Sequence, residues 1–182
     1  MSGKLKIGIV GLGRLGKRHA ANLAWKVKGA ELVAACSVVP GELEWAKTEL
    51  GIGKVYSDYA KMIAASGIDA VYLVSSSSVH AEQIVQALDA GLHVFSEKPM
   101  GVNLAECLMV EKAVASHPDK AFFIGFVRRF DPSYAYAKKL VDEGAIGKPF
   151  LVRSQTVDLD EYAPFQVKFV PTSGGIFLDM NV

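Results

Sequence analysis

Short apolar runs alternate with amphipathic stretches from the amino terminus to about residue 125. Each apolar run has the length of a buried strand, and each longer stretch repeats its apolar residues at helical spacing. Strands that alternate with helices form a parallel sheet with right-handed crossovers. The pattern therefore predicts an α/β fold built on a doubly wound parallel sheet. The predicted strands cover residues 4–10, 31–36, 69–74, 93–95 and 121–125, and the predicted helices cover residues 14–27, 41–50, 59–65, 81–90 and 103–116.

The pattern changes in the last third of the chain. An Asp-Pro pair, which suits an N-cap and a first helical residue, opens a helix predicted for residues 131–144. Partial alternation over residues 149–157 predicts a strand of a new sheet, and a glycine turn leads into an apolar helix over residues 173–180. We expect a first domain at residues 1–125 and the incomplete start of an α+β second domain at residues 126–182.

Composition narrows the function classes. The chain has 182 residues, 51% of them hydrophobic and 21% charged, with a net charge of +1, so it lacks the basic footprint of nucleic-acid or anionic-membrane binding. No apolar run approaches the roughly 18 residues that span a bilayer. Cys36 and Cys107 lie in apolar stretches without metal-ligand spacing, which favours free thiols and predicts no metal site. We expect a cytoplasmic globular protein.

A glycine turn of the form G-x-G-x-x-G follows the first predicted strand and opens the first predicted helix. In this context it indicates a dinucleotide site, whereas the motif alone would be weak. Gly11 allows the tight turn, Gly13 lets the backbone approach a pyrophosphate, and Gly16 lets helix and strand pack closely. The helix that starts at Arg14 and Leu15 then offers its N–H groups to the phosphates. We predict that these five residues bind the cofactor.

The end of the second predicted strand departs from the usual dinucleotide pattern. An acid that binds the ribose hydroxyls is expected about 20 residues beyond the glycines. Ser37 occupies that place, and no Arg or Lys stands beside it to bind a 2′-phosphate. Serine can still hydrogen-bond a ribose, so Ser37 is a candidate cofactor residue. The choice between NAD and NADP stays open, with NAD favoured because the cation is missing.

Four serines, Ser75 to Ser78, follow the third long strand and precede a helix. A strand end followed by a helix is typical of a loop at the ligand edge of the sheet, and we expect the last serine to cap that helix. Ser75 and His80 are therefore candidate cofactor residues. For His80 a structural or solvated role is an equal alternative.

The next strand ends in Glu97-Lys98-Pro99. A strand that ends in charge delivers that charge to the carboxyl edge of a parallel sheet, where ligands bind. Pro99 fixes its own φ and biases Lys98 towards extended geometry, so the lysine lies on a stiff corner. Taken alone, the pair is more often a solvated turn than a ligand site, since most charge pairs lie on the surface. The motifs upstream and downstream of it favour a ligand site.

These motifs together resemble the N-terminal half of the glucose–fructose oxidoreductase, inositol dehydrogenase and rhizopine catabolism (Gfo/Idh/MocA) family, above all its inositol 2-dehydrogenase branch. The resemblance runs along essentially the whole chain. It implies a Rossmann domain followed by a substrate domain with an open-faced sheet, and hydride transfer between a polyol or sugar and NAD or NADP. The resemblance rests on Gly11-x-Gly13-x-x-Gly16, residues 75–80, Glu97-Lys98-Pro99, residues 125–132 and residues 174–179.

The resemblance also implies roles for single residues. Lys98 would contact the reacting hydroxyl as a catalytic and substrate-binding group, and Glu97 would lie near the nicotinamide ribose. Arg128 would approach the substrate, and Asp179 would bind and orient it as a second catalytic residue. The family's proton-transfer histidine would stand four residues after Asp179, at the first position beyond Val182. We therefore expect a C-terminally truncated chain that binds a dinucleotide but turns over polyols poorly.

Two other classes remain open. A non-catalytic dinucleotide-binding module, acting as a sensor or partner protein, would bind cofactor without turnover. An interaction protein would complete the unfinished sheet with another chain, driven by apolar residues such as Phe165, Phe169 and Ile176. For an oxidoreductase and for an interaction protein alike, we expect a homo-oligomer. A methyltransferase also uses a glycine turn, but it offers no place for the Glu-Lys-Pro corner.

Overall fold

A computed structural model describes residues 3–65, 67–157 and 159–175. Within these residues the strands form one fully parallel sheet in the order β3-β2-β1-β4-β5-β6. This is the strand order of a Rossmann fold, so the predicted doubly wound α/β architecture is confirmed. The strands are β1 (Leu5–Val10), β2 (Ala30–Cys36), β3 (Lys54–Tyr56), β4 (Ala70–Leu73), β5 (His93–Ser96) and β6 (Phe122–Ile124).

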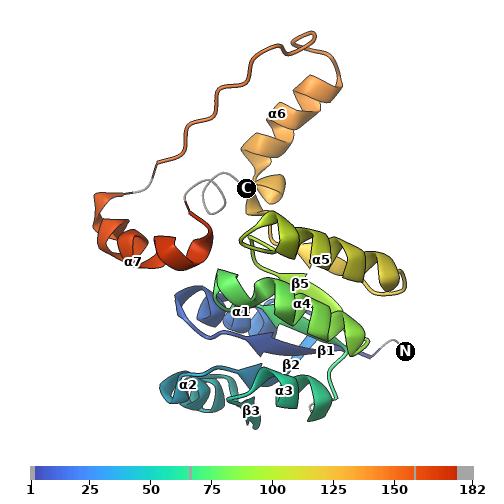
Figure 1. Ribbon diagram of the computed structural model, residues 1–182, viewed down its shortest axis with the longest axis vertical. Helices are drawn as coiled ribbons and strands as arrows, with labels where there is room; N and C mark the ends of the chain where they lie inside the picture. Colours follow the sequence, from blue (N-terminus) through green and yellow to red (C-terminus); the bar gives the residue numbers. More distant parts are fainter. Residues whose placement is uncertain (1–2, 66, 158, 176–182) are drawn as a thin grey trace.

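Helices cover both faces of the sheet (Figure 1). One face carries two helices, and the other carries three, of which α4 and α5 lie side by side. The chain therefore changes faces once, between β3 and β4, as expected when the strand order reverses at β1. The helices are α1 (Arg14–Trp25) and α2 (Pro40–Leu50) on the first face, and α3 (Tyr59–Ala65), α4 (His80–Asp89) and α5 (Leu104–Ser116) on the second.

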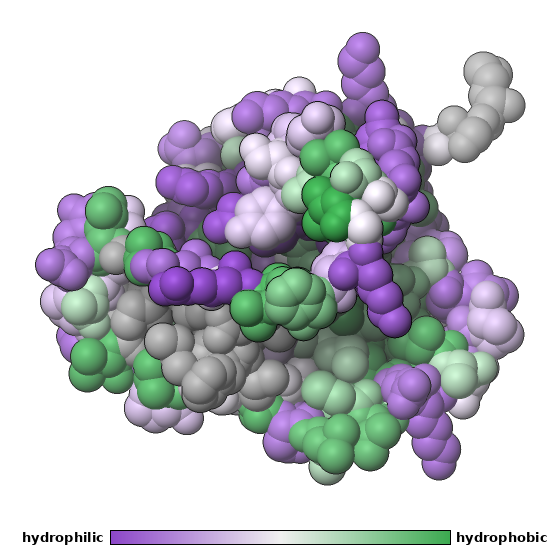
Figure 2. All heavy atoms as spheres, turned by 90° about the horizontal axis from the view of Figure 1, so that it is seen from above, coloured by the Kyte–Doolittle hydropathy of each residue, from purple (hydrophilic) through white to green (hydrophobic). Residues whose placement is uncertain are grey.

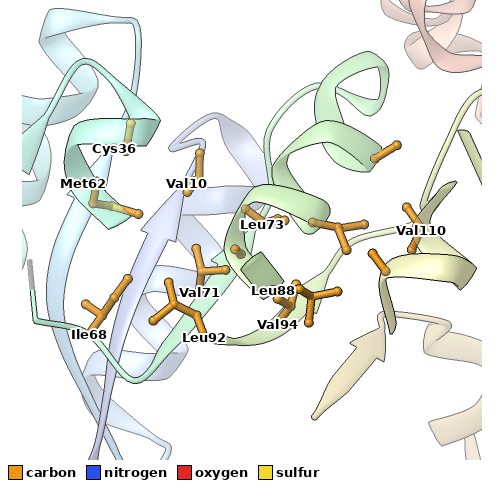
Figure 3. Packing of buried hydrophobic residues seen from close by; sticks show 14 of the residues in the cluster. Val10, Cys36, Met62, Ile68, Val71, Leu73, Leu88, Leu92, Val94 and Val110 are labelled. Carbon is orange, nitrogen blue, oxygen red and sulfur yellow. The ribbon is translucent and has the colours of Figure 1, made fainter. Parts of the chain in front are cut away.

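The period-2 alternation of a strand divides the core in two. Along β1, Ile7 and Ile9 pack among the residues of α1 and α2, while Val10 packs on the opposite face. Figure 3 shows this second cluster, which includes Leu73 of β4 and Leu88 of α4. Both leucines are fully buried. The two clusters fix the helices to the sheet from both sides.

Local capping chemistry sets some of the helix ends. Asn103 caps α5, and its side chain accepts a hydrogen bond from the amide of Glu106 at 3.0 Å, which is one half of a capping box. Gly51 ends α2 with φ +68°. The expected serine cap of α4 is wrong: Ser77–Val79 form a 3₁₀ turn (η1), and Val79, which has no capping group, precedes the helix. The three-residue strand β3 was not predicted because it is too short to show a period.

The described residues after 125 carry two 3₁₀ turns and two helices, with an extended stretch between the helices. The helix predicted at residues 131–144 is confirmed, and its Asp131 cap accepts from the amide of Ser133 at 2.9 Å. The strand predicted for residues 149–157 is wrong, since these residues form no strand in the structure. A strand needs a neighbour for its N–H and C=O groups, and no other described segment pairs with this one. The elements are η2 (Val127–Phe130), α6 (Pro132–Asp142), η3 (Asp160–Tyr162) and α7 (Ala163–Ser173).

The last two helices, α6 and α7, differ in their contact with the first part of the chain. Helix α6 and the extended stretch after it stand away from the sheet, as Figure 1 shows in orange. Helix α7, which the sequence did not predict, returns to contact η1 at the carboxyl edge. Gly174 ends it with φ +81°. The helix predicted beyond the glycine turn lies outside the described residues from 176 onwards.

The core predicts a matched pair of stability effects. Leu88→Ala should lower the free energy of unfolding by about 2–5 kcal/mol, because it leaves a cavity between α4 and the sheet. Leu108→Ala on α5, where the side chain is 53% exposed, should change it by less than about 0.5 kcal/mol. Urea unfolding followed by circular dichroism measures both. Equal effects for the two variants would contradict the assigned core.

Candidate functional site

The glycine turn between β1 and α1 lies at the carboxyl edge, against the end of β4. Gly11 has φ +83°, and a Cβ there would overlap the main chain of Val74 and stand 2.7 Å from the amide nitrogen of Ser75. A Cβ on Gly16 would overlap the carbonyl oxygen of Gly11. Two of the three glycines are thus required by packing alone, because no side chain has room at either position.

Gly13 differs from the other two glycines. It has φ −65° and caps α1, and a Cβ there would meet only the Oε1 atom of Glu42, at 4.0 Å. Packing does not explain a glycine where a side chain has room. Gly13, the N-cap of α1, has no side chain with which to cap the first turn, where Arg14 and Leu15 begin the helix. Open space beside Gly13 at a helix start fits the pyrophosphate of a dinucleotide.

Ser37 lies one residue beyond β2 and is 6% exposed. Its hydroxyl donates to Oε2 of Glu42 at 2.5 Å and accepts from the amide of Val39 at 3.1 Å. The structure therefore brings Ser37 to the predicted end of the site together with an acid that the sequence analysis missed. The available signal was an acid in the first turn of α2, five residues after Ser37.

The serine loop after β4 is fixed by side-chain contacts. Ser75 Oγ donates to Oε1 of Gln83 at 2.5 Å. His80 is only 1% exposed, and its ring nitrogens lie 2.7 Å from the carbonyl oxygen of Pro99 and 3.1 Å from that of Ser75. These contacts support the structural alternative for His80: it ties the loop after β4 to the corner after β5.

The Glu97-Lys98 corner lies at the same edge. The amide of Glu97 donates to the carbonyl oxygen of Leu73, and the amide of Gly11 donates to that of Cys36. Both bonds continue the strand ladders past their last residues, so the corner and the glycine turn lie at the same edge of the sheet, with the end of β4 between them. Lys98 is half-buried and precedes a buried Pro99 across a cis peptide bond.

Glu97 is held on several sides. Its Oε1 lies 2.9 Å from Nε2 of His19, and its Oε2 accepts from the amide of Lys98 at 3.3 Å. A Cβ on Gly125 would stand 3.3 Å from the carboxylate. His19 and Glu97 are both largely buried, with side chains 21% and 16% exposed. Helical spacing puts His19 in one i, i+4 row with Leu15 and Leu23, but nothing in the sequence pairs it with a residue 78 positions away.

Tyr72 and Phe95 form the floor beneath this pair. Their rings stack with centroids 3.8 Å apart and an interplanar angle of 11°, and the His19 ring lies 5.2 Å from that of Tyr72. Burial, and secondly the charge of Glu97, raises the pKa of Tyr72 to about 12. The phenol therefore stays protonated at neutral pH beside a carboxylate.

The predicted substrate residues lie on later elements. Arg128, in η2 just beyond β6, has Nη1 at 3.5 Å from Oδ2 of Asp131 and its guanidinium 5.4 Å from the centre of the Tyr134 ring. Its side chain is 60% exposed. Asp179 lies outside the described residues. The structure thus gathers the candidate cofactor residues and Lys98 at one edge.

Metal centres and membrane spans are both missing from the described part of the chain. No group of three or more His, Cys, Asp or Glu residues there could hold a metal ion. No helix among the described residues is long and apolar enough to cross a membrane.

Comparison with known proteins agrees with this arrangement. Residues 5–126 match the Gfo/Idh/MocA model, described as an oxidoreductase family with an NAD-binding Rossmann fold. The chain belongs to this family. The resemblance drawn from the sequence motifs is confirmed, and so is the expectation of a nicotinamide cofactor at the level of the family.

Similar proteins of this family include inositol dehydrogenases. The scyllo-inositol 2-dehydrogenase (NAD(+)) of Bacillus subtilis is 38% identical over the whole chain, which covers 52% of that protein. The structure of scyllo-inositol dehydrogenase from Lactobacillus casei, with NAD(H) and scyllo-inositol bound, matches 98% of the chain and 53% of its own with 51% identity and a TM-score of 0.91. The chain therefore spans about half the length of these family members.

The corner after β5 predicts a spectroscopic effect. Glu97→Gln should lower the pKa of Tyr72 from about 12 towards 10, because it removes the second cause of the shift while burial remains. Because the pKa of Tyr72 is raised in the folded state, its protonated phenol contributes to the stability of the fold. This contribution is fully present below the unfolded pKa of 10 and is lost as the pH rises to about 12. Alkaline titration of tyrosinate absorbance measures the pKa.

The titration of Tyr72→Phe, which lacks this phenol, identifies the step that belongs to Tyr72. Glu82→Gln, on the exposed face of α4, serves as the matched charge control and should leave the step in place. A Tyr72 step that does not move in Glu97→Gln would show that the carboxylate does not act on the phenol.

Proposed function

We propose that this chain forms the cofactor-binding part of an NAD(P)-dependent oxidoreductase that oxidises a secondary hydroxyl of a cyclitol or sugar, as inositol 2-dehydrogenases do. The observation that carries the proposal is the fixed Glu97-Lys98 corner, which lies at the same sheet edge as the glycine turn, across the end of β4. The names of the family members at 38–51% identity support the cyclitol class.

The cofactor residues follow from the geometry of the edge. Gly11, Gly13 and Gly16 with the first turn of α1, at Arg14 and Leu15, would hold the pyrophosphate. Ser37 would face the adenosine end. Ser75 would line the cofactor site on the β4 side of the glycine turn, and His80 would hold the serine loop after β4 in place. When bound, the nicotinamide ring supplies the hydride acceptor.

The catalytic residues act on the substrate oxygen. Oxidation of a secondary alcohol needs the hydroxyl proton to leave while hydride departs from the carbon. The Lys98 ammonium would contact this oxygen and stabilise the negative charge that develops on it. Glu97, held by His19, would position the nicotinamide ribose. Arg128 and Asp179 would bind and orient the substrate, Asp179 as the second catalytic residue.

The proposal also gives separate roles to the two parts of the chain. Residues 1–125 would bind the dinucleotide, and residues 126–182 would open the substrate and oligomerisation domain. The parallel sheet ends at Ile124, and every described element after it is helical or extended without strand pairing.

Gly13→Ala tests the cofactor site. The structure has room for the new methyl group, so the fold should stay intact, yet the methyl would stand where the pyrophosphate approaches the backbone. We expect NAD⁺ affinity, measured by isothermal titration calorimetry, to fall at least about 10-fold, as when charge-assisted hydrogen bonds worth about 1.5–3 kcal/mol are lost. Gly29→Ala, at an equally open glycine on the amino side of β2, is the control.

Cofactor binding and turnover by the unmutated protein test the proposal as a whole. Absence of NAD⁺ and NADP⁺ binding would refute it. Binding followed by NADH formation on addition of scyllo- or myo-inositol supports the oxidoreductase, whereas binding with no turnover in a protein that includes the family's histidine would favour a dinucleotide-binding module.

Self-association is the remaining part of the proposal. Large apolar side chains of the second part of the chain are open to solvent, including Phe150 at 99%, Val152 at 82% and Val157 at 77%. Figure 2 shows hydrophobic side chains in green exposed on the face seen from above. Because monomers rarely leave so much apolar surface uncovered, we expect a homo-oligomer.

Multi-angle light scattering over a range of protein concentrations tests this expectation. Phe150→Ser with Val152→Ser should shift the mass towards the monomer. Trp25→Ser, at a 66% exposed residue of α1, should not. A monomeric wild-type chain at every concentration would contradict the expectation.

A further inference from the structure

The adenosine end of the site lacks the expected acid at the end of β2, where Ser37 stands. A serine hydroxyl has a single proton to donate. Ser37 already donates it to Glu42 and accepts a hydrogen bond from the amide of Val39. The ribose of a dinucleotide offers two hydroxyl donors, which need strong acceptors. The role of Ser37 at this position is therefore to hold the carboxylate of Glu42 in place.

Glu42 reaches the same place from the next element. It lies in the first turn of α2, where the positive end of the helix dipole stabilises a carboxylate. Its Oε2 is bonded by Ser37, while Oε1 points towards Gly13 and lies 4.0 Å from where a Cβ on that glycine would stand. One carboxylate thus spans the gap between the end of β2 and the turn after β1, where a ribose bound to the glycine turn would lie.

Two lysines of the neighbouring helices are engaged in other contacts. Lys17, one turn into α1, has its ammonium 5.0 Å from the centre of the Trp45 ring. Lys47, on the last turn of α2, pairs with Glu44 at 3.4 Å. A 2′-phosphate placed beside Glu42 would bring a second negative group against a carboxylate that Ser37 holds in position. Repulsion between like charges a few ångströms apart disfavours that arrangement.

We propose that Glu42, held by Ser37, is the ribose-binding acid of this chain and makes its site select NAD(H) over NADP(H). The acid comes from the first turn of α2 and not from the end of β2. Its Oε1 accepts hydrogen bonds from the ribose hydroxyls, and its charge excludes the 2′-phosphate. This assignment rests on the proposed function, since it needs a dinucleotide at the glycine turn.

Binding of NADH and NADPH, followed by nicotinamide fluorescence, tests the assignment. The wild-type chain should bind NADH at least about 10-fold more tightly than NADPH, because NADH forms a charge-assisted hydrogen bond with the carboxylate and NADPH is repelled by it. In Glu42→Gln, NADH affinity should fall and NADPH affinity should rise, so that the ratio approaches one. Ser37→Ala should reduce the ratio less, because the carboxylate stays but loses its holder.

Glu44→Gln provides the matched control. Glu44 lies two residues further along α2, 66% exposed and turned to Lys47, so its loss should leave the ratio unchanged. Circular dichroism confirms that each variant is folded. Should Glu42→Gln misfold, 5′-AMP and adenosine 2′,5′-bisphosphate, which differ only in the 2′-phosphate, test the same repulsion as competitors of NADH on the wild-type chain and on Ser37→Ala, with 5′-AMP expected to compete better on the wild-type chain and by a smaller margin on Ser37→Ala.

The outcomes separate the two levels of the proposal. If the wild-type chain binds neither NADH nor NADPH, the proposed function fails. If it binds NADH but Glu42→Gln keeps the wild-type ratio, the function stands and the role of Glu42 is overturned. Equal binding of NADH and NADPH by the wild-type chain would overturn the role as well.

Discussion

The contact of Gly11 with the end of β4 is the constraint on which the site depends. The absence of a side chain lets the turn after β1 lie against Val74 and Ser75, and Gly16 then rests on the carbonyl oxygen of Gly11. Helix α1 is thereby directed with its first turn facing the carboxyl edge. Its N–H groups, the serine loop and the corner after β5 come into one place because this approach is possible.

From this anchor the edge divides into two ends. Towards β2, Ser37 and Glu42 form a carboxylate site beside Gly13. Towards β5, His19 from α1 holds Glu97, and the stacked rings below keep water from much of that pair. At each of these two places, α1 or the glycine turn before it lies against the residues that follow another strand, β2 in the first case and β5 in the second. A dinucleotide is long enough to need both ends, and the glycine turn lies between them.

The second part of the chain contributes less to this edge. Helix α6 and the extended stretch after it have no sheet to cover, whereas α7 contacts the η1 turn of the serine loop. The exposed apolar residues of the stretch show why alternation over residues 149–157 misled the sequence analysis. Alternation reports a surface that is to be half-buried, but a strand forms only where a partner strand is present.

The sequence alone was enough to predict the alternation of elements, the glycine turn, the capping of α6 and the place of the Glu-Lys corner, because each depends on residues within a few positions of one another. Only the tertiary structure paired His19 with Glu97, 78 residues apart, since strand order decides which elements meet. It also turned Glu42 towards Ser37 and buried His80 between two loops. Side-chain direction and long-range contact leave no local pattern, so these parts of the site required the fold.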